Sequence, residues 1–341
     1  MSHKVLITSL GSIGKRHLRN SRKLLDNPTI GVLRREIKKD ELIEGVNEVF
    51  TSMVEVEKFN PDCVILASPA SEHVKQISFF KKLNKPIFVE KPLGMNFQDV
   101  SKLSLNDQNF CMVGYILRFH STLEKIKRLI EKKEFGEILL AKIEVGQYLP
   151  DWRPGSDYSL GVSAKKHLGG GVLRELSHEL DYCAWLFGFP NQLFCSSSKV
   201  SNLNIDVNDN ATIIFEYSDR KNVTINLDFL QRSPSMNFKI IFEKANIEAN
   251  LLERSIKINS ADVDRYIPHD LPTDTNEDYL RQFDFFFHKS IENYKPFFKS
   301  TKNFTDFVDL GHAKKIMKLI DYCELSNNRG SKITVNKDVL N

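Results

Sequence analysis

Two hydrophobic patterns alternate along the first 120 residues. Short apolar runs are typical of strands buried on both faces of a parallel sheet. They lie at residues 5–7, 30–33, 62–67, 86–89 and 110–115. Apolar residues at helical spacing predict helices at residues 15–25, 72–83 and from about residue 98. Because strands that alternate with helices form a parallel sheet covered on both faces, we predict a doubly wound α/β domain over residues 1–120.

The pattern changes in the second part of the chain, residues 121–341. An amphipathic helix is predicted over residues 122–133, and long alternating runs continue to about residue 267. The clearest runs lie at residues 138–149, 211–217, 223–230 and 238–242. Alternation is typical of half-buried antiparallel strands, so we predict a second, α+β domain on an open, mostly antiparallel sheet. We expect its C-terminal helical segment to pack back on the first domain, and the open sheet face to join subunits in a homodimer or homotetramer.

Composition supports two soluble domains. The chain has 341 residues, 41% of them hydrophobic and 27% charged. This length exceeds one ordinary core, and no apolar stretch approaches the roughly 20 residues that span a bilayer. Residues 1–4 lead straight into the first strand pattern, so we expect no signal peptide and no membrane partner.

The cysteines and the net charge indicate the cellular compartment and the class of ligand. The five cysteines are Cys63, Cys111, Cys183, Cys195 and Cys323. They form no CxxC pair and are odd in number, which predicts reduced thiols and a cytoplasmic location. The net charge is +4 and the basic residues are dispersed, which argues against a nucleic-acid partner and favours small anionic ligands.

A glycine-containing turn follows the first strand. The stretch Ser9-Leu10-Gly11-Ser12-Ile13-Gly14 lies between that strand and a basic helix. Glycines in such a turn let backbone N–H groups approach a pyrophosphate and let the helix pack closely. Ser9 replaces the first glycine of the dinucleotide fingerprint, whereas Gly11 and Gly14 are in place. The pattern predicts a Rossmann domain that binds a dinucleotide.

The second strand ends in Arg34-Arg35. An acid at this position accepts hydrogen bonds from the ribose 2′-hydroxyl of NAD, whereas an arginine accommodates the 2′-phosphate of NADP. Glu36 follows only after the two arginines. We therefore predict NADP as the favoured cofactor, with NAD as an alternative; the other interpretation is a solvated arginine pair on a loop.

Two further strand ends carry polar residues. The apolar run at residues 86–89 stops at Glu90-Lys91-Pro92, and ligands of open α/β sheets lie beyond the carboxyl ends of the strands. Pro92 fixes the backbone after Lys91. The strand before it ends in Ser68-Pro69, and His73 lies one turn into the next helix, near the cofactor or on the surface. The alternative for Lys91 is a surface lysine that closes a loop.

Three glycines, residues 169–171, precede a predicted helix in the second domain. Glu175, His178 and Asp181 are spaced by three and share the face opposite an apolar stripe. This trio can line a cleft, and a solvated polar face or a metal site are the alternatives. Farther upstream, Trp152-Arg153 follows a strand, where an arginine can clamp a carboxylate or phosphate or form a loop ion pair.

These motifs together resemble the Gfo/Idh/MocA family of NAD(P)-dependent oxidoreductases over essentially the whole chain. The motifs are the glycine turn, Glu90-Lys91-Pro92, the run from Gly114 to His120, and the glycine-led helix with Glu175 and His178. The resemblance implies that Lys91 is the catalytic lysine beside the nicotinamide and that His178 is an acid/base. It also implies that Glu175, where the family more often has Asp, helps to position substrate. The stretch around Trp152-Arg153 resembles enzymes of bacterial surface-sugar synthesis.

We therefore predict an oxidoreductase that transfers a hydride between the cofactor and a sugar, anionic in character, in the cleft between the domains. An NAD-dependent glycosidase and a non-catalytic dinucleotide-binding sensor are the alternatives. The candidate catalytic residues are Lys91, His178 and Glu175, and no metal is predicted. The candidate cofactor-binding residues are Ser9, Gly11, Ser12, Ile13, Gly14, Arg34, Arg35, Ser68, Pro69, His73, Glu90 and Lys91. The candidate substrate-binding residues are Arg118, Trp152, Arg153, Lys166, Glu175 and His178.

Overall fold

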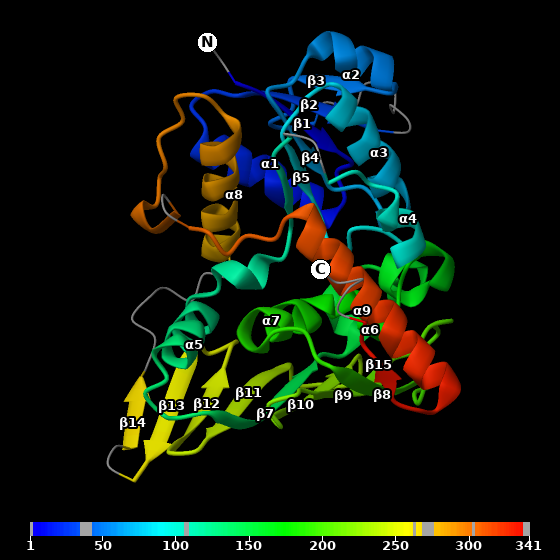
Figure 1. The fold of residues 1–341 in the computed structure, drawn as a ribbon. Coiled ribbons are helices and arrows are strands. Elements are labelled where there is room, and N and C mark those ends of the chain that lie inside the picture. Colours follow the sequence, from blue (N-terminus) through cyan, green and yellow to red (C-terminus); the bar gives the residue numbers. More distant parts are fainter. Residues whose placement is uncertain are drawn as a thin grey trace. The chain divides into compact units, whose positions relative to one another are not determined.

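The computed structural model describes residues 3–34, 43–105, 109–261, 264–267, 276–301 and 304–336 (Figure 1). The chain divides into two compact units. Unit 1 comprises residues 1–119 and 275–314, and unit 2 comprises residues 120–274 and 315–341. Each unit has its own sheet.

Unit 1 contains a six-stranded sheet in the order β3-β2-β1-β4-β5-β6, in which every neighbouring pair is parallel. Its strands are β1 (Lys4–Thr8), β2 (Thr29–Leu33), β3 (Glu48–Phe50), β4 (Cys63–Leu66), β5 (Ile87–Val89) and β6 (Cys111–Val113). The central strands are buried on both faces, which is why they are uninterrupted apolar runs. The predicted doubly wound parallel sheet is confirmed.

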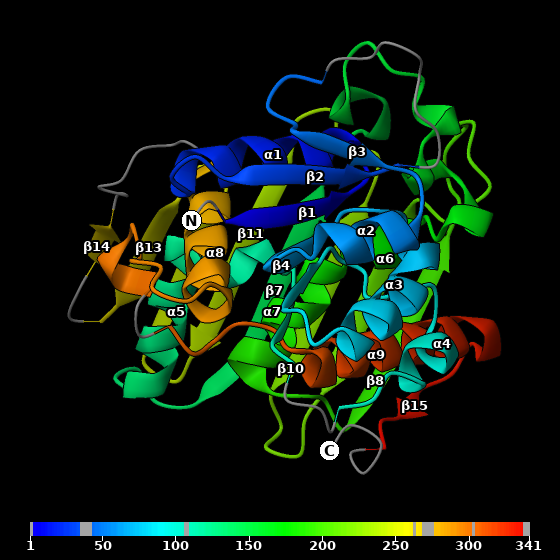
Figure 2. The same cartoon turned by 90° about the horizontal axis from the view of Figure 1, so that it is seen from above.

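Helices cover both faces of this sheet. They are α1 (Ser12–Leu24), α2 (Met53–Phe59), α3 (Ala70–Lys82), α4 (Phe97–Ser101) and α8 (Asn276–Ser290). The views show α1 and α8 on one face and α2 and α3 on the other (Figures 1 and 2). The phenylalanines of α8 are fully buried, and Phe283 and Phe286 contact Phe88 of β5. A helix from the far end of the chain therefore completes the core of unit 1.

Strand β3 and helix α2 were not predicted from the hydrophobic pattern. Ser52 begins α2 with a capping box: its side chain accepts from the amide of Glu55, and the carboxylate of Glu55 accepts from the amide of Ser52. This S-x-x-E sequence is a recognisable helix start. Strand β3 has only three residues and one exposed end, which leaves too short a run for a periodicity argument.

Unit 2 contains a nine-stranded sheet in the order β14-β13-β12-β11-β7-β10-β9-β8-β15. Its strands are β7 (Ile138–Gly146), β8 (Gln192–Ser198), β9 (Asn210–Glu216), β10 (Asn222–Asp228), β11 (Ser235–Phe242), β12 (Ala245–Asn250), β13 (Ser255–Ser260), β14 (Asp264–Ile267) and β15 (Ile333–Thr334). All pairs are antiparallel except β7 with β10. The predicted mostly antiparallel domain is confirmed.

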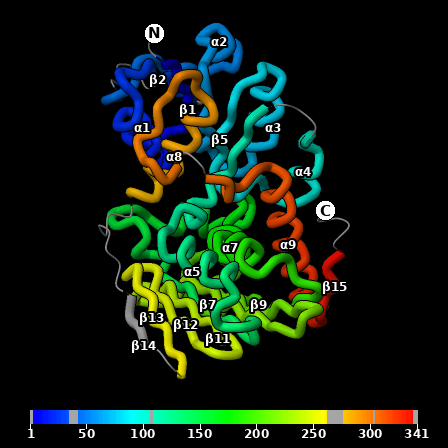
Figure 3. The backbone as a smooth tube through the Cα atoms, turned by 60° about the vertical axis from the view of Figure 1, so that its left-hand side comes forward, coloured from blue at the N-terminus to red at the C-terminus, as the bar shows by residue number. Residues whose placement is uncertain are grey.

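Helices α5 (Ser121–Lys132) and α7 (Ser177–Phe187) run along one face of this sheet (Figure 3). Residues from 315 onward of α9 (Leu310–Arg329) also belong to unit 2. There, Ser326 Oγ accepts a hydrogen bond from the amide of Cys195, and Asn327 Oδ1 accepts from the amide of Ser197. These bonds fix α9 to β8. In the described part of the chain, no helix is both long and apolar enough to cross a membrane.

The glycine-led helix of unit 2 is interrupted. The sequence predicts one helix after Gly171, whereas the structure has α6 (Val172–Glu175) and α7, separated by Leu176 with φ −98° and ψ 37°. The predicted polar face also differs, because Asp181 is buried at 1% exposure. The break rotates α7 relative to α6, so a spacing of three does not place Glu175 and His178 on a common helical face.

Candidate functional site

A cavity of about 760 Å³ lies at the carboxyl ends of the first strands of unit 1. Its walls come from the β1–α1 turn, the end of β2, the β3–α2 connection and the start of α3. The lining residues are Thr8, Ser9, Leu10, Gly11, Leu33, Arg34, Thr51, Met53, Ser68, Pro69, Glu72, Lys75 and Gln76. Both its volume and its place are those of ligand sites in open α/β sheets.

The glycine turn shapes one wall of this cavity. Ser9 has φ +74°, a conformation that glycine adopts without strain, so the turn keeps the shape of the fingerprint despite the substitution. A Cβ on Gly14 would lie 2.2 Å from the carbonyl oxygen of Ser9, whereas a Cβ on Gly11 would meet nothing within 4 Å. Gly14 therefore permits the packing of α1 against the turn, and Gly11 leaves open space for a phosphate beside the backbone.

Replacing Gly14 with Ala is expected to lower the free energy of unfolding by about 1–3 kcal/mol, because the methyl group would overlap a backbone oxygen. Gly11→Ala is the matched control, since its methyl group enters open space in the same turn. Urea unfolding of the ligand-free protein measures both changes. Equal midpoints for Gly14→Ala and the wild type would contradict the packing role of Gly14.

Polar side chains form the base of the cavity. Gln76 Oε1 accepts hydrogen bonds from Ser68 Oγ at 2.7 Å and from Thr8 Oγ1 at 3.4 Å. The amide of Ala67 donates to Thr8 Oγ1 at 3.2 Å. Gln76 was not predicted as a site residue. It lies two turns into α3, a helix whose start was predicted. The other lining residues missed by sequence reasoning are Thr8, Leu10, Leu33, Thr51, Met53, Glu72 and Lys75.

Arg34 is the predicted specificity residue that the structure describes. It lines the cavity just after β2, and its amide donates to the carbonyl of Phe50 at 2.9 Å, which fixes its backbone to β3. Arg35 lies outside the described residues. Arg34 and Lys75 bring positive charge to the cavity wall, and Glu72 brings a carboxylate.

The Lys91 segment follows β5 in the same sheet. The amide of Lys91 donates to Glu90 Oε2 at 3.2 Å, and Glu90 Oε1 lies 2.7 Å from Nε2 of His17. His73 is buried at 1% exposure, with its ring nitrogens 3.0 Å from the carbonyl oxygen of Pro92 and 2.9 Å from that of Ser68. Of the predicted cofactor residues, Ser12, Ile13, Gly14, His73, Glu90 and Lys91 are outside the set that lines the cavity.

The predicted substrate residues lie in different surroundings. Arg118 is 4% exposed, and its guanidinium bonds Nε2 of His312 at 2.9 Å within unit 1. Trp152 and Arg153 line a cavity of about 230 Å³ in unit 2, together with Tyr158. Trp152 is fixed by a bond from Nε1 to the carbonyl of Gln147 at 3.2 Å, whereas Arg153 is exposed.

The remaining predicted residues of unit 2 are Lys166, Glu175 and His178. Lys166 is exposed, and its amide donates to Asp206 Oδ1 at 2.6 Å. Glu175 ends α6 and His178 is the second residue of α7, and both side chains are half-buried. Among the described residues, no group of three His, Cys, Asp or Glu side chains is arranged to hold a metal ion.

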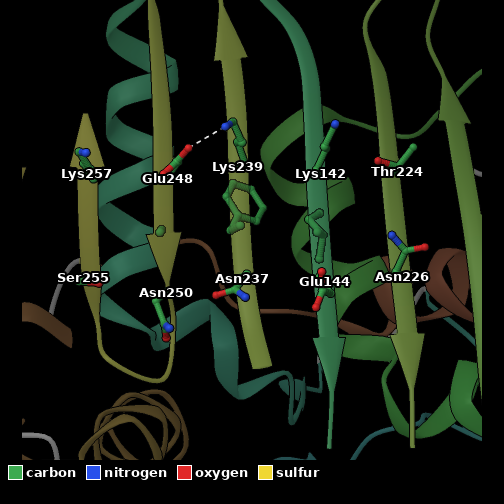
Figure 4. A pocket seen from close by; sticks show the side chains of 13 residues that line it. Lys142, Glu144, Thr224, Asn226, Asn237, Lys239, Glu248, Asn250, Ser255 and Lys257 are labelled. Carbon is green, nitrogen blue, oxygen red and sulfur yellow. Dashed lines mark hydrogen bonds and ion pairs between the residues drawn. The ribbon is translucent and has the colours of Figure 1, made fainter. Parts of the chain in front are cut away.

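A shallow groove of about 460 Å³ crosses the polar face of the nine-stranded sheet (Figure 4). Three lysines and two acids line it, with Lys239 of β11 directly opposite Lys142 of β7. Lys239 also pairs with Glu248 of β12 at 2.6 Å. Lys142, Glu144 and Asn226 point from the neighbouring strands. Subunit association through this face stays a prediction.

The fold and the cavity define the class of the protein. A parallel sheet with a glycine turn and a cavity at its strand ends is a dinucleotide-binding Rossmann domain, here followed by a mostly antiparallel sheet domain. Residues 3–114 match the model of the oxidoreductase family with an NAD-binding Rossmann fold, and residues 123–248 match the GFO/IDH/MocA C-terminal domain. The chain belongs to the Gfo/Idh/MocA family of oxidoreductases, which confirms the resemblance.

Curated relatives are named as inositol dehydrogenases. Myo-inositol 2-dehydrogenase of Thermotoga maritima is 24% identical over 195 residues, 54% of this chain and 55% of the relative. Inositol 2-dehydrogenase of Rhodococcus jostii is 26% identical over 194 residues, 54% of this chain and 50% of the relative. The chain spans about half the length of the curated relatives it matches.

Solved structures share the whole fold. Levoglucosan dehydrogenase in complex with NADH has a TM-score of 0.81 and 16% identity, covering 98% of this chain and 100% of that one. The WlbA dehydrogenase of Bordetella pertussis, in complex with NADH and UDP-GlcNAcA, has a TM-score of 0.77 and 16% identity, covering 98% and 99%. At this identity the likeness shows the fold.

Proposed function

We propose that this protein is a nicotinamide-dependent sugar oxidoreductase. In the oxidative direction, the carbinol carbon of the sugar loses a hydride to the nicotinamide, and its hydroxyl proton passes to a base on the protein. The products are a keto sugar, reduced cofactor and one proton. Family membership supports this reaction, as do the names of the inositol and levoglucosan dehydrogenases to which the chain is similar.

The position of Lys91 carries the proposal. It follows the carboxyl end of β5, in the sheet whose strand ends also border the cofactor-sized cavity. We assign Lys91 Nζ as the group that exchanges the hydroxyl proton, and His178 as a second acid/base. Glu175 orients a sugar hydroxyl through its carboxylate. These assignments follow from the family motif and the chemistry that each side chain supplies.

A substrate screen tests the proposal. Purified protein is incubated with NAD⁺ or NADP⁺ and with neutral polyols, sugars, sugar acids and nucleotide sugars, and the absorbance of reduced nicotinamide is followed. We expect turnover of at least one sugar class, with a product lighter by two hydrogen atoms. Release of an aglycone without net cofactor reduction would instead identify a glycosidase. Cofactor binding without any turnover would favour a sensor.

We further propose that Arg34 gives a preference for NADP(H). A bidentate guanidinium–phosphate contact contributes about 1.5–3 kcal/mol, or roughly 10–150-fold discrimination in kcat/KM. Arg34→Ala is expected to remove most of this preference, and added salt to reduce it, because a contact at the cavity rim is screened. The measurement is kcat/KM for both cofactors at low and high salt.

Lys75→Ala is the matched comparison for Arg34→Ala, since Lys75 is a second cation on the same cavity wall. An equal loss of preference in both variants would point to the general charge of the wall rather than to a contact with Arg34. A wild-type enzyme that prefers NAD(H) would refute the proposal outright.

The third proposal is that the sugar is anionic and that Arg153 binds its charged group. Arg153 is exposed at a cavity wall beside Trp152, whose ring packs edge-on against Phe229 with centroids 5.1 Å apart. A fixed aromatic beside an arginine suits a sugar that carries a carboxylate or phosphate.

Arg153→Ala is expected to raise KM for a sugar acid by roughly 10–150-fold, which corresponds to the loss of a charged hydrogen bond of about 1.5–3 kcal/mol. Arg153→Lys should recover only part of the affinity, because it keeps the charge and loses the planar fork. KM for a neutral polyol serves as the internal control. Equal turnover of neutral and acidic sugars, unchanged in Arg153→Ala, would show that the substrate is not selected by charge at this residue.

A further inference from the structure

We propose that two buried histidines, His17 and His73, are positioning residues that hold Lys91 in place. They bond the residues on either side of it, Glu90 and Pro92. His17 belongs to α1 and His73 to α3, so two separate helices restrain one short segment. The inference deepens the proposed function, because it rests on the catalytic role of Lys91.

Among the described residues, the one polar contact of His17 is to Glu90. Its side chain has 0% exposure, and Nε2 lies 2.7 Å from Glu90 Oε1. A carboxylate oxygen accepts, so the N–H belongs on Nε2. The ring is enclosed by Phe88 and Phe283, with centroids at 5.6 and 4.5 Å, and Nδ1 has no hydrogen-bond partner in the part of the chain that the structure describes. The two apolar rings thus fix the orientation of the imidazole, with Nε2 directed at Glu90.

Glu90 transmits this restraint to Lys91. Its second carboxylate oxygen accepts from the backbone amide of Lys91 at 3.2 Å, and its own amide donates to the carbonyl of Leu66 at 2.9 Å. The side chain of Glu90 is only 12% exposed. Gly114 leaves room for it, because a Cβ there would lie 3.1 Å from Glu90 Oε2. The carboxylate therefore bridges the imidazole of His17 and the backbone that carries Lys91.

His73 acts on the other side of Lys91. Nδ1 faces the carbonyl oxygen of Pro92 at 3.0 Å, and Nε2 faces that of Ser68 at 2.9 Å. Burial lowers the pKa of His73, against the opposing effect of these two carbonyls and of Glu90. We place the N–H on Nδ1, which then donates to Pro92, and the ring lies between the ends of β4 and β5, two neighbouring strands. This places the backbone after Lys91 at a fixed distance from the cavity residue Ser68.

Both contacts end on the catalytic segment itself. The loss of a histidine with only a structural role would lower stability without changing the surroundings of Lys91. Here the loss of either donor releases a residue adjacent to Lys91. Small displacements of a reacting group lower the rate far more than they lower binding.

The test compares His17→Phe, which keeps an aromatic ring and removes the donor, with His17→Gln, which keeps an N–H donor. We expect His17→Phe to lower kcat by up to about 100-fold, because a misplacement of about 1 Å caused by a mutation away from the chemistry can cost that much. KM and the Kd for the cofactor should stay near the wild-type values, and the primary deuterium isotope effect on kcat should rise. His17→Gln should recover most of kcat. His73→Phe and His73→Gln are expected to differ in the same way.

A second readout needs no turnover. The rate at which acetic anhydride modifies Lys91, measured by mass spectrometry relative to Lys85, reports the surroundings of its amine directly. This rate should change in His17→Phe and stay constant in His288→Gln, a control that alters a half-buried histidine of α8 in the same unit. Should His17→Phe fail to fold, Glu90→Gln weakens the same bond with little change in shape.

The outcomes separate the two hypotheses. If folded variants keep both kcat and the labelling rate of Lys91, positioning is overturned. A fall in kcat that matches a fall in cofactor affinity and thermal midpoint, with unchanged labelling, also overturns it and indicates a structural role. If the wild type turns over no sugar, the proposed function fails, while the labelling experiment still decides whether the histidines position Lys91.

Discussion

Replacing Lys91 with Ala is expected to lower kcat about 10²–10⁴-fold while cofactor binding persists. General acid/base groups typically contribute that much, and Lys91 is the residue that the family motif assigns to proton exchange. The chain offers a matched control in Lys85→Ala, because Lys85 precedes β5 and bonds the side chain of Asn60 at 2.7 Å. Steady-state kinetics and a cofactor titration measure both variants.

A double variant tests whether Lys91 and His178 serve one proton relay. If they do, Lys91→Ala with His178→Ala should lose far less activity than the product of the two single losses, because the second change removes a group that no longer functions. Fully multiplicative losses would show two independent roles. A Lys91→Ala enzyme with normal kcat would end the assignment of Lys91.

The largest effect on stability is expected at Asp284 in α8. Its side chain is fully buried, and its carboxylate accepts four hydrogen bonds. The donors are the Tyr294 hydroxyl at 2.7 Å, the amides of Phe297 and Phe298 at 2.6 and 3.0 Å, and Thr301 Oγ1 at 2.5 Å. Burial raises the pKa of Tyr294, and so does its bond to Asp284, so the phenol remains a donor.

Asp284→Ala is expected to lower the free energy of unfolding by about 3–5 kcal/mol, because it leaves buried donors without their acceptor. Urea unfolding followed by circular dichroism measures the loss. Asp26→Ala, at an exposed acid of the same unit, should change stability by no more than about 0.5 kcal/mol. A similar small effect at Asp284 would mean that water replaces the carboxylate without cost.

The sequence predicted the fold because buried positions are apolar and recur with the period of the helix or strand that contains them. Parallel strands covered on both faces must be apolar throughout, so the run at residues 62–67 marked β4, observed at Cys63–Leu66. Strands of unit 2 bury one face only, so their alternation predicted β9 and β10 within about two residues. The glycine turn was recognisable for a similar reason, since Gly14 must lack a side chain wherever the helix approaches Ser9.

Periodicity did not reveal which distant segments meet. The hydrophobic pattern gave no bounds for the phenylalanine-rich helix α8, and the tertiary structure places its phenylalanines in the core of unit 1. The break at Leu176 contains no glycine or proline, so no local signal in the sequence predicts it.

The candidate site divides in the same way. The sequence was enough to propose the residues that directly follow a strand. These are the glycine turn after β1, Arg34 after β2 and Lys91 after β5. Only the tertiary structure added Gln76 at the base of the cavity, enclosed Arg118 with His312, and joined His17 and His73 to the residues flanking Lys91. Such contacts link residues as many as 194 positions apart in the chain. A local pattern cannot predict these contacts, because the partner of each side chain is distant in the sequence and comes close only in the folded protein.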